Sequence, residues 1–247
     1  MTDTVDIKIR RQDGREKNSY WEHFSIPYRP HMNVISLLME IQRNPVNAEG
    51  QSTSPVVWDC SCLEEVCGAC SMVINGRVRQ ACSARVDSLE QPIVLEPMSK
   101  FPCVRDLAVD RSRMFETLKR VRAWIPIDGT YELGPGPKMS ERERAEAYEF
   151  SRCMTCGCCV EACPQVNDRS KFIGAFAMGQ VQLFNKHPTG KMQKEDRLDG
   201  LLGEGGLTEC GNAQNCEAVC PKEIPLTRAI AEAGWDLTKH AVKKFFR

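Results

Sequence analysis

The residues of this sequence best suited to chemistry by type and spacing are its cysteines. A chain of 247 residues contains 14 of them, and most stand in runs with the spacing of metal ligands. The first group has the pattern C-x4-C-x2-C with a fourth cysteine further on, and consists of Cys62, Cys67, Cys70 and Cys82. Plant-type [2Fe–2S] clusters are bound at this spacing. A four-cysteine zinc site usually combines two C-x2-C pairs, and this group contains one, so the spacing favours the cluster over zinc.

The backbone around this first group also suits a cluster. Gly68 lets the chain approach the inorganic sulfur closely and donate its N–H group, and such hydrogen bonds raise the reduction potential. Cys82 follows a predicted hairpin whose turn is Asn75-Gly76, the strongest short hairpin signal. Cys60 and Cys103 lie outside the spacing, and we interpret them as buried thiols with no ligand role.

Two more cysteine runs follow in the second half of the chain. The first has the bacterial ferredoxin pattern C-x2-C-x2-C-x3-C-P, formed by Cys153, Cys156, Cys159 and Cys163-Pro164. The second has the same register with alanine at the middle ligand position, and consists of Cys210, Ala213, Cys216 and Cys220-Pro221. Chance does not explain two registered runs that each end in Cys-Pro.

In two-cluster ferredoxins the fourth cysteine of each run binds the other cluster. This rule predicts a complete [4Fe–4S] ligand set, which is Cys153, Cys156, Cys159 and Cys220. The other set has three thiolates and consists of Cys163, Cys210 and Cys216. Since Ala213 supplies no ligand, the spacing predicts a [3Fe–4S] cluster at the second site. Cys158 adjoins Cys159 but breaks the spacing, so we interpret it as a spare thiol.

The first half of the chain is expected to be mixed α and β. Val5, Ile7 and Ile9 alternate with polar residues, as in a half-buried strand, and residues 22–28 are a candidate partner strand. Asn33 is a plausible N-cap for a helix with one apolar face, formed by Val34, Leu37, Leu38 and Ile41. The hairpin around residues 71–81 and a short strand at 93–95 complete this half.

The second half is expected to be helical. The first predicted helix follows an Asp110 cap and has one apolar face, formed by Met114, Leu118, Val121 and Ile125. A second begins at a Ser140–Glu143 capping box, and two more are expected at residues 171–184 and 226–239. A loop rich in proline and glycine is expected at residues 127–138. We therefore predict an α+β chain: a plant-type ferredoxin (β-grasp) domain at residues 1–112 and an all-α bacterial-ferredoxin-like domain at residues 113–247.

The composition and net charge indicate what kind of protein carries these sites. Hydrophobic residues make up 42% and charged residues 27%, and the formal net charge is +0, which indicates a globular chain with no global field for nucleic acid. Residues 1–13 lack the apolar core of a signal peptide, and no apolar run is long enough to span a membrane. We expect a cytoplasmic protein with reduced thiols, whose membrane contact depends on a partner or a surface patch.

The order of one plant-type site and two ferredoxin runs, the second lacking a cysteine, resembles the iron–sulfur subunits of succinate dehydrogenase and fumarate reductase. The resemblance covers almost the whole chain. It is carried by the Glu65-Val66-Cys67-Gly68-Ala69-Cys70 core, by Val104-Arg105-Asp106-Leu107, by Lys171-Phe172-Ile173-Gly174 and by residues 210–230. The resemblance implies an electron-transfer subunit with no substrate chemistry of its own.

The same resemblance implies partners. A flavoprotein carrying FAD would oxidise succinate, and electrons would pass through the [2Fe–2S], [4Fe–4S] and [3Fe–4S] clusters to a quinone. A membrane cytochrome b carrying haem would anchor the chain at the cytoplasmic face of the cell membrane. The basic C-terminal segment, residues 239–247, would touch this anchor or lipid headgroups, or else form a solvated tail.

One departure bears on the quinone. Ubiquinone-linked members often place tryptophans after the first Cys-Pro and a histidine after the first cysteine of the second run. Here these positions are Gln165-Val166-Asn167-Asp168 and Gly211. The whole amino-acid sequence is similar to the subunits of the Gram-positive type. That type is similar to menaquinone-linked enzymes with a single dihaem cytochrome b anchor. We therefore expect menaquinone near the [3Fe–4S] cluster.

Three other interpretations stay open at this point. A fumarate reductase subunit would have nearly the same sequence, because the direction of electron flow depends on potentials and on the quinone pool. A free-standing polyferredoxin would shuttle electrons between soluble enzymes, although the two-domain length favours a docked subunit. A structural zinc protein would lack the brown colour of iron–sulfur clusters.

Overall fold

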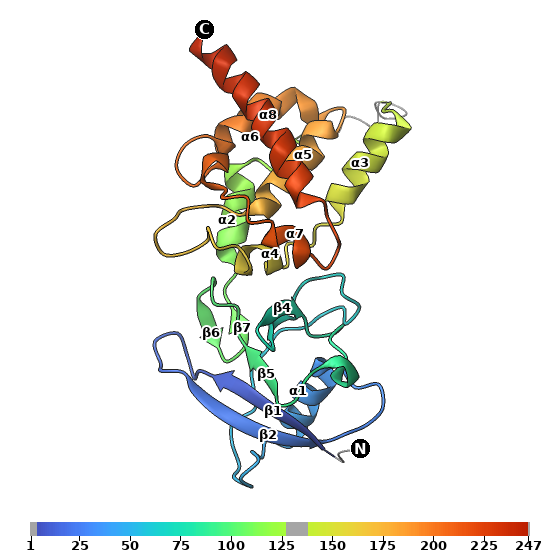
Figure 1. Ribbon diagram of the computed structural model, residues 1–247, viewed down its shortest axis with the longest axis vertical. Helices are drawn as coiled ribbons and strands as arrows, with labels where there is room; N and C mark the ends of the chain where they lie inside the picture. The colour runs from blue at the N-terminus through green and yellow to red at the C-terminus, as the bar shows by residue number, and fades with distance from the viewer. Residues whose placement is uncertain (1–3, 127–137, 247) are drawn as a thin grey trace. The chain divides into compact units, whose positions relative to one another are not determined.

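The computed structural model describes residues 4–126 and 138–246, and it divides into two compact units (Figure 1). The first unit comprises Met1–Arg111 together with Cys156–Glu161, and the second comprises Ser112–Thr155 and Ala162–Arg247. The linear domains predicted from the sequence, 1–112 and 113–247, stay a prediction about which parts fold independently. The predicted loop at residues 127–138 lies, except for Lys138, outside the described residues.

A five-stranded mixed sheet with one covering helix forms the first unit. The strand order is β2-β1-β5-β3-β4, with β1 and β5 parallel and the other neighbours antiparallel. The strands are β1 (Thr4–Arg11), β2 (Tyr20–Pro27), β3 (Ser71–Ile74), β4 (Arg77–Gln80) and β5 (Ile93–Glu96). The covering helix is α1 (Val34–Arg43), and a small ribbon is formed by β6 (Cys103–Arg105) and β7 (Ala108–Val109). This topology confirms the predicted β-grasp fold.

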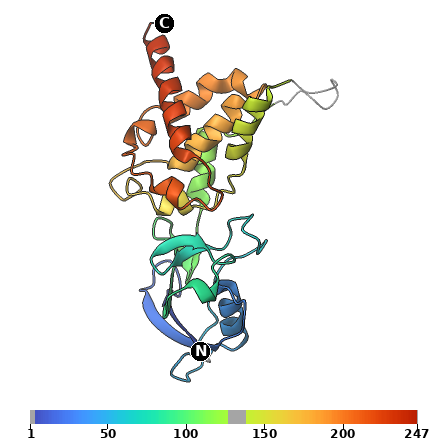
Figure 2. The ribbon, with the colours of Figure 1, turned by 45° about the vertical axis from the view of Figure 1, so that its right-hand side comes forward.

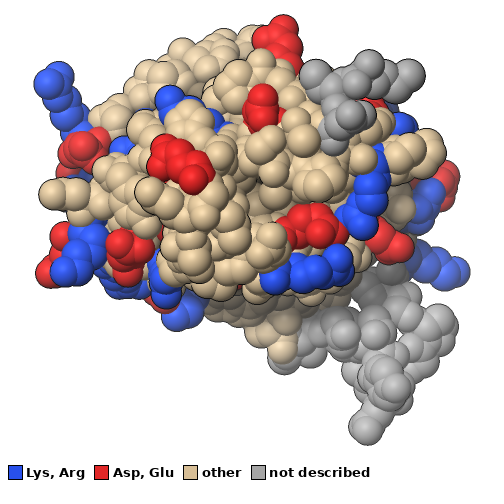
Figure 3. All heavy atoms as spheres, turned by 90° about the horizontal axis from the view of Figure 1, so that it is seen from below, with Lys and Arg blue, Asp and Glu red and all other residues tan. Residues whose placement is uncertain are grey.

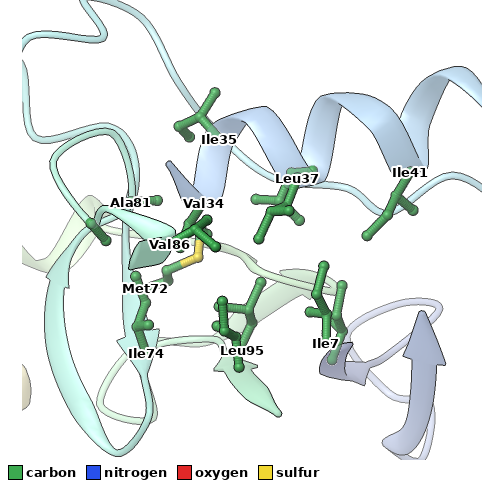
Figure 4. Close-up of a cluster of buried hydrophobic side chains, with 14 of the residues drawn as sticks. Ile7, Val34, Ile35, Leu37, Ile41, Met72, Ile74, Ala81, Val86 and Leu95 are labelled. Carbon is green, nitrogen blue, oxygen red and sulfur yellow. The ribbon is translucent and has the colours of Figure 1, made fainter. Parts of the chain in front are cut away.

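The core of this unit lies between α1 and the sheet. Ile7 from β1 and Leu95 from β5 face Leu37 and Ile41 of the helix, and all four are almost completely buried (Figure 4). The predicted cap is present, because the side-chain oxygen of Asn33 accepts the N–H of Ser36 at 2.9 Å. The alternation in β1 and the helical face in α1 therefore pack as the sequence indicates.

A buried ion pair fixes the chain just before the first cysteine group. Arg11 and Asp106 are both fully buried, and Nε of Arg11 donates to Oδ1 of Asp106 at 2.9 Å. The second carboxylate oxygen of Asp106 accepts the backbone N–H of Val57 at 2.9 Å. Removing one partner of such a pair leaves an uncompensated buried charge, at a cost of about 3–5 kcal/mol. Asp106 thus anchors the extended segment that leads into the cysteine loop.

The second unit is built of helices packed around α5. Helices α3 and α8 lie against α5, whose residues from Ala175 to Gln182 are buried, as expected for a helix covered on all sides (Figure 2). The helices are α2 (Ser112–Arg120), α3 (Glu141–Ser151), α5 (Ala175–Lys186), α6 (Lys194–Leu201), α7 (Asn215–Ala218) and α8 (Leu226–Phe245); the short α4 (Cys158–Glu161) belongs to the first unit.

Three helix ends differ from the sequence predictions. Helix α5 begins at Ala175 rather than Lys171, because Gly174 has a φ of 96° that no right-handed helix contains. Helix α2 ends at Arg120, before Ile125, and Arg122 adopts a left-handed φ of 46°. Helix α8 continues to Phe245, so most of the basic C-terminal segment is helical. The Ser140–Glu143 capping box is confirmed.

The surface and the helix lengths agree with the composition. On the face shown in Figure 3, acidic and basic side chains are interspersed around the edge, and no patch of one sign covers it. In the part of the chain that the structure describes, no helix is long and apolar enough to cross a membrane.

Candidate iron–sulfur cluster sites

The loop of the first cysteine group directs backbone N–H groups at its sulfur atoms. The sulfur of Cys62 accepts the N–H groups of Glu64, Val66 and Cys67 at 3.4, 3.2 and 3.3 Å. The sulfur of Cys67 accepts those of Cys62 and Ala69, each at 3.4 Å. The three hydrogen bonds to the Cys62 sulfur, led by that of Glu64, lower the pKa of Cys62 to about 7, because N–H dipoles stabilise a thiolate. The loop is thus shaped to hold a ligating sulfur.

Left-handed residues give this loop its curl. Leu63, Glu65 and Gly68 have φ values of 60°, 55° and 73°. Successive reversals of this kind turn several N–H groups toward one point, which is the geometry of an anion-binding nest. The carboxylate of Glu65 also accepts the hydroxyl of Ser83 at 2.5 Å, which joins the loop to the residue after Cys82.

The other two proposed ligands lie at the base of the hairpin. Cys70 precedes β3 and Cys82 follows β4, and the N–H of Ala81 donates to the carbonyl of Cys70 at 3.0 Å. Burial, together with the neighbouring thiol of Cys82, raises the pKa of Cys70 to about 12. The side-chain amide of Asn33 donates to the carbonyl of Cys82 at 2.9 Å. The cap of α1 therefore positions the fourth cysteine, a role that the sequence did not reveal.

The first unit thus brings the predicted set Cys62, Cys67, Cys70 and Cys82 into one loop and hairpin. Cys60 is exposed, and partial desolvation of its sulfur, followed by the charges of Asp59, Cys67 and Cys82, raises the pKa of its thiol. The expectation that Cys60 is buried is therefore wrong, although it lies near the set. Cys103 is half-buried in β6. Its sulfur donates to the carbonyl of Asp106 at 3.5 Å, which agrees with a thiol outside the ligand set.

The segment Cys156–Glu161 of the first ferredoxin-type cysteine run packs with the first unit. The carboxylate of Glu161 accepts the N–H groups of Ser99 and Lys100 at 2.9 and 2.8 Å, and the hydroxyl of Ser99 at 2.7 Å. Cys158 is completely buried, and its interpretation as a spare thiol stays a prediction. A hydrogen bond to Cys158 and burial raise the pKa of Cys156.

Gln80 links this segment to the first cysteine group. It is fully buried in β4, and its amide nitrogen donates to the hydroxyl of Ser71 at 2.8 Å. The same nitrogen lies 3.5 Å from the sulfur of Cys158, and the amide oxygen lies 3.5 Å from the sulfur of Cys70. No spacing rule marks such a glutamine, so sequence reasoning missed it. The predicted [4Fe–4S] set of Cys153, Cys156, Cys159 and Cys220 stays a prediction, because Cys153 and Cys220 belong to the second unit.

The three cysteines of the predicted [3Fe–4S] set line one cavity of the second unit. The wall of this cavity contains Cys163, Cys210, Cys216 and Ala213. Burial, with the neighbouring Cys163 and Cys210, raises the pKa of Cys216 to about 11. Asn212 and Gln214 flank Ala213 with left-handed φ values of 51° and 61°, so the chain curls here as it does around Cys62.

Gly211, which replaces the histidine of ubiquinone-linked members, also lies in this cavity. Gly211 and Gln165 both line it, and a Cβ placed on Gly211 would lie 2.3 Å from the amide nitrogen of Gln165. The side chain of Gln165 therefore occupies the space beside residue 211. The side chain of Asn215 donates to the carbonyl of Ala162 at 3.1 Å and joins the two cysteine runs.

The donor sets suit polynuclear clusters. Among the described residues, no three side chains of histidine, cysteine, aspartate or glutamate are close enough to share a single metal ion. A cluster needs no such convergence, because its thiolates are divided among several iron atoms. All the proposed ligands are cysteines, which are the usual ligands of iron–sulfur clusters.

Two family models match the chain. A model for a 2Fe-2S iron-sulfur cluster binding domain matches residues 6–116. A model for a 4Fe-4S dicluster domain matches residues 149–224. The chain therefore contains both a [2Fe–2S] domain and a [4Fe–4S] domain, as the cysteine spacing predicts.

Similar proteins cover almost the whole chain. The succinate dehydrogenase iron-sulfur subunit of Bacillus subtilis is 62% identical over 98% of this chain and 96% of its own length. The fumarate reductase iron-sulfur subunit of Wolinella succinogenes is 30% identical over 92% of this chain and 94% of its own length. A chain in the structure of the Mycobacterium smegmatis Sdh1 complex in the apo form has a TM-score of 0.78 at 22% identity, with 97% of both chains covered. This last likeness confirms the fold.

Proposed function

Because the chain belongs to the family of succinate dehydrogenase and fumarate reductase iron–sulfur subunits, we propose that it conducts electrons from a flavoprotein through three clusters to menaquinone. It is the electron-transfer subunit of an oxidoreductase complex, and it associates with other subunits of succinate dehydrogenase. We propose that those subunits are a flavoprotein and a membrane cytochrome b, that the third cluster is a [3Fe–4S] cluster, and that the quinone is menaquinone.

The observation that carries the third cluster is the cavity around Ala213. Three cysteines line it, and the residue in register for a fourth is an alanine. When bound, the clusters supply one-electron carriers. The chain's own contribution is to hold them: N–H groups stabilise the Cys62 and Cys67 sulfurs, and burial shields Cys70 and Cys216 from water.

The ligand assignment follows the spacing. The [2Fe–2S] cluster is held by Cys62, Cys67, Cys70 and Cys82, the [4Fe–4S] cluster by Cys153, Cys156, Cys159 and Cys220, and the [3Fe–4S] cluster by Cys163, Cys210 and Cys216. No substrate chemistry is assigned to this chain. Succinate oxidation is assigned to the flavoprotein partner that the family resemblance implies.

The partners follow from the order of the clusters. A flavoprotein would dock on the first unit near the exposed Leu63 and Val66 of the cysteine loop. A membrane cytochrome b would dock on the second unit near Cys163 and Cys210, and would hold the chain at the cytoplasmic face of the membrane. Extraction in mild detergent followed by mass spectrometry tests this assembly. Recovery of the chain only as a free monomer would count against both partners, and would revive the free-standing electron carrier.

Menaquinone is the proposed acceptor. Asp168 and Gly211 stand where ubiquinone-linked members have aromatic and histidine contacts, and Gly211 lines the cavity. Membranes should therefore reduce menaquinone analogues faster than ubiquinone analogues, and a clear preference for ubiquinone would refute this assignment. The reverse direction, fumarate reduction, is the second candidate, because the fumarate reductase subunit of Wolinella succinogenes aligns over almost the whole chain.

A further inference from the structure

Arg111 contacts both cluster-binding segments of the first unit. Its Nη1 atom donates to the carbonyl of Gly68 at 2.6 Å, within the [2Fe–2S] loop. The same atom lies 3.4 Å from the carbonyl of Cys156, a proposed [4Fe–4S] ligand. Nη2 donates to the carbonyl of Ala69 at 3.4 Å. The guanidinium group therefore joins the backbones of two segments that are far apart in the sequence.

The charge of Arg111 is not neutralised by an acid. Within residues 4–126 and 138–246 its hydrogen bonds go to carbonyl groups, and it forms no ion pair with aspartate or glutamate. Arg11 provides a contrast in the same unit, because its charge is paired with Asp106 and Glu22. Carbonyl dipoles solvate a cation without cancelling it. A full positive charge therefore acts on the surroundings of both segments.

We propose that Arg111 is a positioning residue that raises the reduction potentials of both the [2Fe–2S] and the [4Fe–4S] clusters. This inference rests on the proposed function, in which electrons pass through both of these clusters. Reduction adds one electron to a cluster, with no bond made or broken in the chain, and the added negative charge is stabilised by a nearby cation. Net charge and hydrogen bonding around the sulfurs are the terms that set cluster potentials.

A cation shared by two clusters has a distinctive consequence. Both potentials rise together, so the driving force for electron transfer between the two clusters changes little. The driving force for accepting an electron from the flavoprotein rises with the potential of the first cluster. Arg111 thus favours electron entry in the direction of succinate oxidation, and its loss should favour the reverse direction.

The test is a potentiometric titration followed by EPR, carried out on the protein purified with its partner subunits. Arg111→Gln should lower the midpoint potentials of both clusters relative to the wild type. Arg111→Lys retains the charge and should remain close to the wild type. Arg43→Gln removes an equal charge at the exposed end of α1, where Arg43 pairs with Glu40, and should leave both potentials unchanged.

Two results would overturn the inference: unchanged potentials in a fully loaded Arg111→Gln protein, or equal falls in the Gln and Lys variants, which would indicate loop geometry instead of charge. Should Arg111→Gln lose its clusters, Arg111→His provides the same test within one protein. The potentials of this variant should fall more steeply than those of the wild type as pH rises through about 6.5, where imidazole loses its charge. An unchanged pH slope would also reject the inference. Absence of either cluster from the wild type would instead count against the relay.

Discussion

A Cβ atom placed on Gly68 would lie 2.6 Å from the Cβ of Cys156, closer than two such carbon atoms can approach. Gly68 also has a φ of 73°, which a residue with a side chain adopts at a cost. The glycine therefore serves two purposes in the [2Fe–2S] loop. It completes the left-handed curl, and it lets the first bacterial-type cysteine run lie directly against the plant-type loop.

Gly68→Ala should therefore destabilise the first unit more than its φ alone would suggest. Gly76→Ala is a matched control, since Gly76 has a φ of 75° but no atom within 4 Å of an added Cβ. The control should lose about 1–2 kcal/mol from left-handed strain, whereas Gly68→Ala should lose more and retain less iron. Thermal unfolding and iron analysis of the two variants provide the comparison. Equal losses would mean that the approach of Cys156 does not depend on Gly68.

The spacing of the first cysteine group makes Cys67 a ligand of the [2Fe–2S] cluster and excludes Cys60 from the ligand set. Cys67→Ala should abolish the EPR signal of the reduced [2Fe–2S] cluster, because one of its four thiolates is missing. Cys60→Ala should retain that signal, since the exposed Cys60 lies outside the C-x4-C-x2-C pattern. Loss of the signal in the Cys60 variant would show that the register is wrong.

Gln80 should stabilise the packing of the two cysteine segments. Gln80→Leu keeps the volume but removes the donor to Ser71 and the contact with the Cys158 sulfur. A lost buried hydrogen bond of this kind should lower the free energy of unfolding by about 1–3 kcal/mol. Denaturant titration measures this loss. Gln51→Leu, at an exposed glutamine, should stay within about 0.5 kcal/mol of the wild type, and a similar result for Gln80→Leu would contradict the bridging role.

Ala213 should determine the nuclearity of the third cluster. Ala213→Cys places a thiolate in register for a fourth iron, and the added negative charge favours the oxidised state. The variant should lose the three-iron EPR signal, gain a reduced [4Fe–4S] signal and have a lower midpoint potential. Quinone reduction should then slow, since the last transfer becomes less favourable. A variant that gains a fourth iron with an unchanged potential would contradict the electrostatic part of this prediction.

Short-range signals in the sequence predicted most of the fold. The alternation of Val5, Ile7 and Ile9, the Asn33 cap and the Asn75-Gly76 turn are each determined by neighbouring residues, and the structure confirms all three. The Ser140–Glu143 capping box is confirmed for the same reason. Helix ends were less accurate, because the φ of Gly174 and the tertiary packing decide where α5 begins.

The contacts that connect the cysteine groups could not be predicted in this way. Gln80, Arg111 and the close approach of Gly68 to Cys156 join residues more than 40 positions apart, and no periodicity or spacing rule relates them. The exposed Cys60 was predicted to be buried because cysteines usually are. Ligand spacing is local, whereas the arrangement of one ligand loop against another depends on the packed fold.

The most direct test of the account is the EPR spectrum of the air-oxidised and then dithionite-reduced wild-type complex. The three-cluster account predicts a [3Fe–4S] signal in the oxidised sample, and [2Fe–2S] and [4Fe–4S] signals after reduction. The oxidised signal matters most, because it depends on Cys163, Cys210 and Cys216 around Ala213. A complex with full iron content and no three-iron signal in any redox state would contradict the account.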